Sequence, residues 1–215
     1  VLFFYCPNGA PHVSWKMELG QIDLEGSVFS RRKMRTAIVH EWLATYAGAE
    51  RVLEQILALY PDAELFAVID FLPEAERQGI KKADRTSFLQ HAPFARTRYR
   101  SYLPLMPFAM ERLDLSAYDL ILSSSHAVAK GVRKRPGQLH ICYCHTPMRY
   151  VWSGYDIYRR SVGALGRMIF PSVAAYLRRW DYQAAQQVTH FVANSRNVAE
   201  RIRRYYGRES AVIHP

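Results

Sequence analysis

The sequence predicts an α/β protein with a doubly wound, mainly parallel β-sheet. Short apolar runs typical of buried strands alternate along the chain with stretches that place apolar residues at helical spacing. Strands that are separated by helices favour parallel connections within one sheet. The chain has 215 residues and is 49% hydrophobic, so it can bury one substantial core.

Seven apolar runs are the expected strands of this sheet. They cover residues 36–40, 64–69, 86–89, 118–123, 139–144, 188–193 and 211–214. The run over residues 139–144 is typical of a buried strand, because it is largely apolar and too brief to stand alone as a helix.

The expected helices lie between these strands. Residues 49–59, 128–131 and 197–206 are predicted to be helical. Pro104 and Pro107 predict broken helical pieces over residues 94–113. A long helical region over residues 162–187 is expected to be interrupted at Pro171, and the whole pattern is Rossmann-like.

Residues 1–33 differ from the rest of the chain, because they show turn-prone residues and no sustained period. We expect a poorly ordered amino-terminal extension before one domain over residues 34–215, with a capping hairpin as the alternative. The first ten residues lack the pattern of a secretory signal, and three cysteines are too few for a disulfide framework. A cytoplasmic location is therefore expected.

The formal net charge of +10 predicts attraction to nucleic acid, to an anionic membrane surface or to a phosphorylated substrate. Nucleic acid is disfavoured, because the basic residues are dispersed and no nucleic-acid-binding motif is present. Arg178 and Arg179, with Arg159, Arg160 and Arg167, are candidates for contact with anionic lipid headgroups. A solvated basic face is the favoured interpretation of these arginines.

A ligand site is predicted where the strand over residues 139–144 stops. Pro147 cannot donate a ladder hydrogen bond, so the strand must end near His145 and leave its imidazole at the carboxyl edge of the sheet, where the strands end. Ligands of open α/β sheets bind at that edge. The polar and aromatic residues that follow are further candidates for ligand contact: Arg149, Tyr150 and Trp152.

Three other strand ends carry candidate ligand residues. The small-residue turn at Gly48, Ala49 and Glu50 can bring backbone N–H groups and a helix dipole to a phosphate, although an ordinary strand-to-helix connection is the alternative. The hydroxyls of Ser123, Ser124 and Ser125 and the ring of His126 could bond sugar hydroxyls, or Ser125 could merely cap a helix. At the next edge, Asn194 and Arg196 flank Ser195, which we expect to be a helix N-cap.

A metal site is one hypothesis for His140, Cys142, Cys144 and the adjacent His145, because alternation places the first three on one strand face. The two cysteines lack the usual spacer and no second pair follows, so buried inert thiols are expected instead. No metal and no other cofactor is predicted. A Ser-His-Asp triad is disfavoured, because the serines lack the G-x-S-x-G elbow.

Four ordered segments together resemble the amino-terminal half of family 4 glycosyltransferases, especially the bacterial mannosyltransferase-like branch that builds surface polysaccharides such as lipopolysaccharide. They are MRTAIVHEWLATYAGAERVL (34–53), YDLILSSSHAVAKGV (118–132), HICYCHTPMRYVW (140–152) and THFVANSRNVAERIRRYYGRESAVIHP (189–215). The resemblance implies one half of an enzyme with two Rossmann-like domains, in which this half binds the acceptor. The donor-binding carboxyl-terminal domain would be absent, so the fragment alone is expected to be inactive.

The resemblance also implies a reaction and its residues. A sugar would pass with retention from a nucleotide sugar, with GDP-mannose favoured, to a polysaccharide or lipid-linked acceptor, without a metal and with peripheral membrane contact. His145 would lie beside the transferred sugar, and Gly48 would approach the donor phosphates. Ala47 stands where family members often carry glycine. Arg149 and Arg196 would be anion contacts.

A nicotinamide-dependent oxidoreductase is a competing hypothesis from another class. It would share the sheet, and Asp70 fits the acidic residue expected at the end of the second strand. It also requires three glycines in the first turn, whereas Gly48 is the only glycine between residues 40 and 53. A basic nucleic-acid-binding module is the other alternative, for which only the charge argues.

Overall fold

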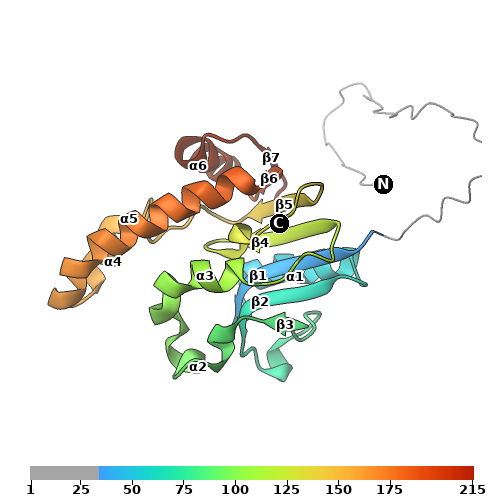
Figure 1. The fold of residues 1–215 in the computed structure, drawn as a ribbon, viewed down its shortest axis with the longest axis horizontal. Helices are drawn as coiled ribbons and strands as arrows, with labels where there is room; N and C mark the ends of the chain where they lie inside the picture. Colours follow the sequence, from blue (N-terminus) through green and yellow to red (C-terminus); the bar gives the residue numbers. More distant parts are fainter. Residues whose placement is uncertain (1–33) are drawn as a thin grey trace, which may run out of the picture. The chain divides into compact units, whose positions relative to one another are not determined.

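One sheet of seven parallel strands organises the computed structural model, which describes residues 34–215 (Figure 1). The strand order is β3-β2-β1-β4-β5-β6-β7, and every neighbouring pair is parallel. The strands are β1 (Thr36–Leu43), β2 (Glu64–Asp70), β3 (Arg85–Thr86), β4 (Leu120–Ser125), β5 (Leu139–Cys144), β6 (His190–Ala193) and β7 (Ser210–Val212). The predicted α/β fold class is confirmed. The predicted extension over residues 1–33 lies outside the described residues.

Helices connect the strands. The α-helices are α1 (Gly48–Leu59), α2 (Ala95–Arg98), α3 (Met106–Glu111), α4 (Tyr155–Ser161), α5 (Ala164–Gln187) and α6 (Arg196–Tyr206). Short 3-10 helices are η1 (Glu74–Glu76), η2 (Phe88–His91), η3 (Tyr99–Leu105) and η4 (Ala129–Gly131). The run α2, η3 and α3 confirms the broken helical pieces that the prolines predict.

Apolar side chains cover both faces of the sheet. On one face, Leu53 and Leu57 of α1 pack in a core cluster with Ile38 and Leu65. A larger cluster joins the sheet to α3, η4 and α5, where Met106 and Trp180 are buried. A third cluster joins the end of α5 to α6 through the two cysteines of β5. Burial of this apolar area is the main force that holds the fold.

A buried ion pair ties α5 to η4. Nζ of Lys130 contacts Oδ1 of Asp181, and both side chains are almost fully buried. The other carboxylate oxygen of Asp181 accepts hydrogen bonds from Trp152 Nε1 and Tyr206 Oη, each at 2.7 Å. Asp181 therefore holds together residues from η4, the loop after β5, α5 and α6.

The long helix corrects one prediction. α5 continues through Pro171 from Ala164 to Gln187, whereas an interruption was expected. Proline leaves the carbonyl four residues earlier without its helical partner, and that carbonyl belongs to Arg167, which is exposed and open to water. The helix also begins at Ala164, two residues later than predicted, because Val162 is the C-cap of a separate helix, α4.

The third predicted strand is also corrected. β3 contains only Arg85 and Thr86, and the residues expected to extend it form η2. The hydroxyl of Ser87 donates to the carbonyl of Val68 and accepts from the N–H of Leu89, which turns the chain into the 3-10 helix. β4 begins and ends two residues later than predicted, at Leu120 and Ser125.

The strand order reverses direction between β1 and β4. The chain builds the sheet outward from β1 through β2 to β3, then returns to the other side of β1 and continues through β4 to β7. Connections leave β1 and β4 in opposite directions across the sheet. Ligands of doubly wound sheets bind at such a switch point, beyond the carboxyl ends of the strands.

Candidate active site

Polar residues from three neighbouring strands meet at this switch point. His40 and Glu41 lie near the carboxyl end of β1, and Ser124 lies beside His40 in the register of β4. His145 directly follows β5, and its backbone N–H donates to the carbonyl of Ser125. The predicted position of His145 at the carboxyl edge of the sheet agrees with the structure.

A chain of hydrogen bonds connects His145 to the start of α1. Nε2 of His145 lies 2.9 Å from Oγ of Ser124, which lies 3.2 Å from Nδ1 of His40. Nε2 of His40 lies 3.4 Å from Oε1 of Glu50, and the other oxygen of Glu50 accepts the N–H of Ala47 at 2.9 Å. Hydrogen bonds thus connect four side chains, which come from β1, from β4, from the residue after β5 and from α1.

The hydrogen bonds of this cluster are satisfied by one tautomer of His145. The carboxylate of Glu50 can only accept, so Nε2 of His40 donates to it. When Nδ1 of His40 accepts from the hydroxyl of Ser124, the oxygen of Ser124 accepts from Nε2 of His145. The remaining nitrogen of His145, Nδ1, keeps its lone pair. This nitrogen is able to accept a hydrogen bond from a ligand hydroxyl.

The ring of His145 is neutral near neutral pH. Burial lowers the pKa of His145 to about 4, and the nearby rings of His40 and His126 add to that effect. The ring also lies at 5.2 Å from that of Tyr143. A neutral ring in fixed orientation suits recognition of a sugar hydroxyl rather than attraction of an anion.

Glu41 organises the loop that follows β4. Its carboxylate is fully buried, and Oε1 accepts from the hydroxyl of Ser125 at 2.9 Å and from the N–H groups of His126, Ala127 and Ala129 at 2.8, 2.7 and 3.2 Å. Ser125 is thus engaged with Glu41 and lies out of contact with solvent. Its predicted sugar contact would require this bond to change.

His126 carries the opposite electrostatic tendency to His145. Its Nδ1 lies 3.0 Å from Oε2 of Glu41, and its side chain is 23% exposed. Burial opposes the charged imidazole, but the carboxylate of Glu41 outweighs burial and raises the pKa of His126. Burial alone would raise the pKa of Glu41, yet His126 and His40 lower it well below its usual value. The protonated form of His126 is therefore favoured, and its ring lies 6.4 Å from the neutral ring of His145.

The first turn of α1 opens toward the same edge. Gly48 and Ala49 are the first two helical residues, so their N–H groups have no acceptor within the helix. A side-chain carbon added to Gly48 would meet nothing within 4 Å, which leaves room for a ligand. Ala47 is extended, with φ −140° and ψ −158°, so this loop does not require glycine there. Glu50 points inward to His40 rather than toward a ligand.

The residues after His145 divide into two groups. Arg149 is exposed and Tyr150 is half-buried, so both are accessible. Trp152 instead has a packing role, because its Nε1 donates to Asp181 and its ring stacks on Tyr205 at 4.8 Å. Contact of Trp152 with a ligand remains a prediction that would involve only its exposed edge.

Ser195, which follows β6, has the capping role predicted for it. The hydroxyl of Ser195 accepts the N–H of Val198 at 3.3 Å, which confirms Ser195 as the N-cap of α6. Asn194 is partly exposed and Arg196 is exposed at the first helical residue. Both side chains are accessible at the carboxyl edge.

The residues considered as metal ligands have different surroundings. Cys142 and Cys144 are buried, and burial raises the pKa of the Cys142 thiol to about 12. Nε2 of His140 bonds Oγ of Ser123 at 2.8 Å, within the sheet. Within the described part of the chain, no three His, Cys, Asp or Glu side chains form a group that could hold a metal ion.

Buried histidines make stability depend on pH. Burial lowers the pKa of His140 to about 3 and that of His145 to about 4, whereas an unfolded histidine titrates near about 6.5. The unfolded chain therefore binds more protons below about pH 6.5, so the free energy of unfolding falls as the pH drops toward the folded values.

His140→Leu is expected to reduce this acid sensitivity by up to about 1.4 kcal/mol per pH unit, because it removes one such proton. Urea unfolding at about pH 7 and about pH 5 measures the slope. His91→Leu is the matched control, since His91 is exposed. An unchanged slope in His140→Leu would contradict the assignment of a neutral buried ring.

His40 and Glu41 are members of the site that the sequence patterns did not predict. A signal existed, because His40 and Glu41 are adjacent titratable residues within an otherwise apolar strand. Buried charge in a strand requires partners, and these partners often belong to a functional site. The partners themselves depend on the register between β1 and β4.

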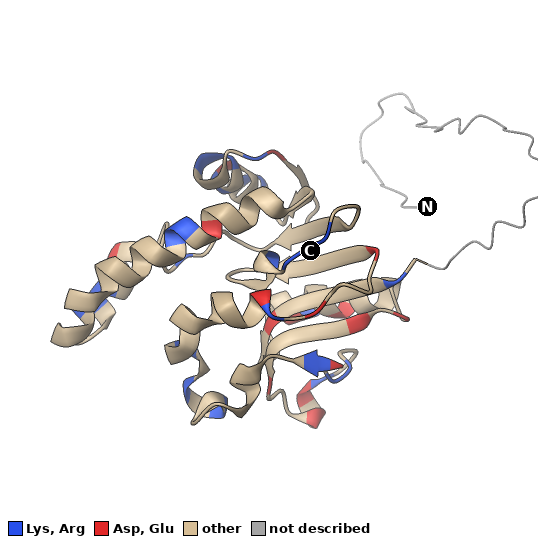
Figure 2. Ribbon diagram, viewed as in Figure 1, with Lys and Arg blue, Asp and Glu red and all other residues tan. Residues whose placement is uncertain are grey.

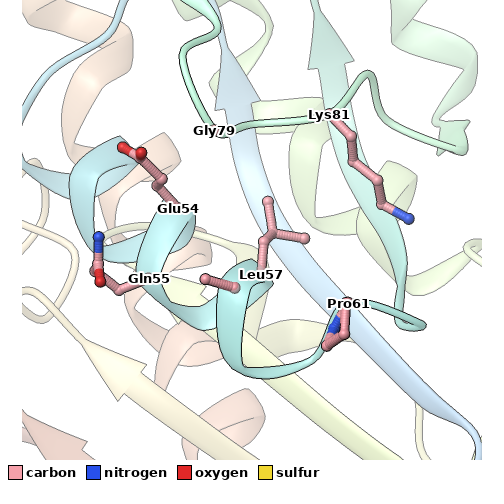
Figure 3. A pocket seen from close by; sticks show the side chains of 7 residues that line it. Glu54, Gln55, Leu57, Pro61, Gly79 and Lys81 are labelled. Carbon is pink, nitrogen blue, oxygen red and sulfur yellow. The ribbon is translucent and has the colours of Figure 1, made fainter.

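Two other features lie apart from this site. Asp70, which an oxidoreductase would use for ribose, is buried and bonds Arg77 at 2.8 Å. A shallow pocket lies at the far end of α1, on the amino edge of the sheet (Figure 3). It is lined by Glu54, Gln55, Leu57, Ala58, Pro61, Gly79 and Lys81. Neither feature faces His145.

Comparison with known families fits this geometry. The model of Glycosyltransferase Family 4 matches residues 46–215. The chain belongs to glycosyltransferase family 4. None of the curated proteins matches the chain. A glycosyltransferase domain with a parallel Rossmann-like sheet therefore carries the switch-point cluster, and the match includes α1, Ser124 and His145.

Proposed function

We propose that this chain is the acceptor-side domain of a retaining glycosyltransferase that transfers mannose from GDP-mannose to a polysaccharide or lipid-linked acceptor. The observation that carries the proposal is the neutral imidazole of His145, which Ser124 orients at the carboxyl edge next to the start of α1. In a member of family 4, this arrangement suits one wall of a sugar-transfer cleft.

The reaction requires stabilisation of the charge that develops on the leaving group. As the sugar takes on oxocarbenium character, negative charge accumulates on the departing nucleoside diphosphate. The N–H groups of Gly48 and Ala49, at the positive end of the α1 dipole, face that charge. Arg149 and Arg196 are the proposed additional anion contacts from this domain, and no metal is required.

His145 acts on the sugar itself. Its Nδ1 accepts a hydrogen bond from a sugar hydroxyl and orients the ring for transfer. A role as general base is weaker, because a group with a pKa near about 4 binds a proton poorly at neutral pH. His126, Tyr150, Trp152 and Asn194 line the proposed acceptor side.

The opposite wall of the cleft belongs to a donor-binding domain that would follow this chain. We propose that the 215 residues alone do not turn over, because the groups that hold the nucleotide are in that second domain. An acceptor carried on lipid would place the enzyme at the cytoplasmic face of a membrane.

The test is a screen of the full-length enzyme, in which this domain is joined to its downstream coding sequence. Nucleotide sugars are combined with lipid-linked acceptors, and the product is examined by mass spectrometry and for its anomeric configuration. Transfer from GDP-mannose with retention supports the proposal. Reduction of a nicotinamide cofactor without sugar transfer, or turnover by the isolated 215 residues, would contradict it.

Ser124→Ala is expected to lower kcat roughly ten-fold with little change in KM, because it frees the ring of His145 from its orienting bond. Ser123→Ala is a matched control, since Ser123 is an equally buried neighbour that bonds His140 instead. Initial rates of both variants in the full-length enzyme separate orientation from loss of stability. Equal rates for the two variants would show that the Ser124 bond has no part in transfer.

A further inference from the structure

The first half of α5 extends beyond the folded core. α5 has 24 residues and is about 36 Å long, whereas the six-residue strand β5 spans about 20 Å. The first buried residue of α5 is Ala174, and α4 has no buried residue. We call residues 155–173 the α4–α5 tip, and it projects away from the sheet (Figure 1).

The tip lies at the same edge of the sheet as His145. The chain leaves β5 at the carboxyl edge, forms α4, and returns along α5 to the amino edge where β6 begins. The start of α5 is therefore at the carboxyl edge. A partner bound to the tip would therefore lie near the carboxyl edge of the sheet, where His145 is located.

Large apolar side chains are exposed on the tip. In α5, Leu165, Met168 and Ile169 are 68%, 73% and 50% exposed, and their spacing of three and four residues places them on one face. Ile157 of α4 is 71% exposed. Clustered exposure of this kind marks a surface that binds something apolar.

Arginines accompany these side chains. Arg159, Arg160 and Arg167 are exposed, and none of them forms an ion pair within residues 34–215. Asp156 is the only acidic residue of the tip. Arg167 donates to the carbonyls of Val162 and Arg160, so it lies over the corner between the helices. Figure 2 shows the basic residues along α4 and α5.

Arg178 differs from the other arginines that are candidates for lipid contact. Arg178 donates to the carbonyl of Val151 at 2.7 Å, and its guanidinium lies over the rings of Trp152 and Tyr155. It is therefore engaged within the domain. The basic surface available to a partner is formed by the tip and by exposed Arg179.

We propose that the α4–α5 tip docks on a membrane surface that contains anionic phospholipids. Apolar side chains would enter the boundary between headgroups and acyl chains, while the arginines pair with lipid phosphates. Charge complementarity selects this occupant over an uncharged apolar partner. Within residues 34–215, no helix combines the length and hydrophobicity needed to cross a bilayer. This proposal extends the proposed function, because docking would present a lipid-linked acceptor to His145.

The test is sedimentation of the 215-residue chain with vesicles of phosphatidylcholine alone or of equimolar phosphatidylcholine and phosphatidylglycerol. The wild-type chain is expected to prefer the anionic vesicles. The double variant Leu165→Ser/Met168→Ser is expected to bind them at least about ten-fold more weakly. Leu59→Ser is the apolar control, since Leu59 is 72% exposed at the opposite edge.

A charge-matched pair completes the experiment. Arg159→Gln/Arg160→Gln is expected to weaken binding roughly 25-fold, while Arg203→Gln/Arg204→Gln on α6, with the same net charge, leaves it nearly unchanged. Equal losses of binding in both pairs, or no preference for anionic vesicles, would overturn the proposal. It would also be overturned if the tip variants changed only the oligomeric state, measured by analytical ultracentrifugation, and left vesicle binding intact. Vesicle binding uses no sugar, so loss of transfer with binding intact would count against the proposed function alone.

Discussion

His145→Ala in the full-length enzyme is expected to lower kcat for sugar transfer by about 100-fold or more, because it removes a preorganised group that contacts the transferred sugar. The loss should appear at saturating donor and acceptor, since the bond serves the reacting sugar. Initial rates with GDP-mannose measure it. The variant should remain folded at neutral pH, because the side chain of His145 is only partly buried.

Two further variants define the role of this ring. His145→Asn keeps a polar group near the position of Nδ1 and is expected to retain more activity than His145→Ala. His91→Ala removes an exposed histidine that follows β3, the outermost strand on the other side of β1 from β5, and should be neutral. Wild-type rates from His145→Ala would remove the central site assignment.

Asp181→Ala is expected to lower the free energy of unfolding by about 3–5 kcal/mol, because it leaves the charge of Lys130 buried without its partner. Trp152 and Tyr206 would also lose their acceptor. In the native protein, burial opposes the charge on Lys130, but Asp181 outweighs it and raises the pKa of Lys130. Urea unfolding measures the loss.

Comparison variants separate the ion pair from simple loss of a side chain. Asp156→Ala, at an exposed position of α4, should change stability little. Lys130→Met/Asp181→Leu should be less destabilised than the sum of its single variants, because neither charge is left alone. Additive losses would contradict an energetically coupled pair. The Asp181→Ala variant should also gain stability as the pH rises, since an unfolded lysine holds its proton more tightly than an unpaired buried one.

The strands and most helices follow from local patterns, which is why the sequence predicts them well. Leu53 and Leu57 recur at helical spacing because one face of α1 is buried. α4 was missed for the converse reason, since it buries no residue and so shows no apolar period. The interruption at Pro171 was wrong because an exposed carbonyl can exchange its helical bond for water.

The candidate site was predictable only where one segment defines it. Pro147 ends β5 locally, so the position of His145 at the edge follows from the sequence. The bond from His145 to Ser124, and onward to His40, depends on the pairing of β1 with β4 and β5. That register joins residues 84 and 21 positions apart, and no local pattern contains it.

The contact between His145 and the transferred sugar can be measured directly by nitrogen NMR of the full-length enzyme with labelled histidine, assigned through the His145→Asn variant. We predict an unprotonated Nδ1 at neutral pH whose resonance moves when GDP-mannose is added. An Nδ1 resonance that stays unchanged while other signals report saturation with the donor would contradict the contact.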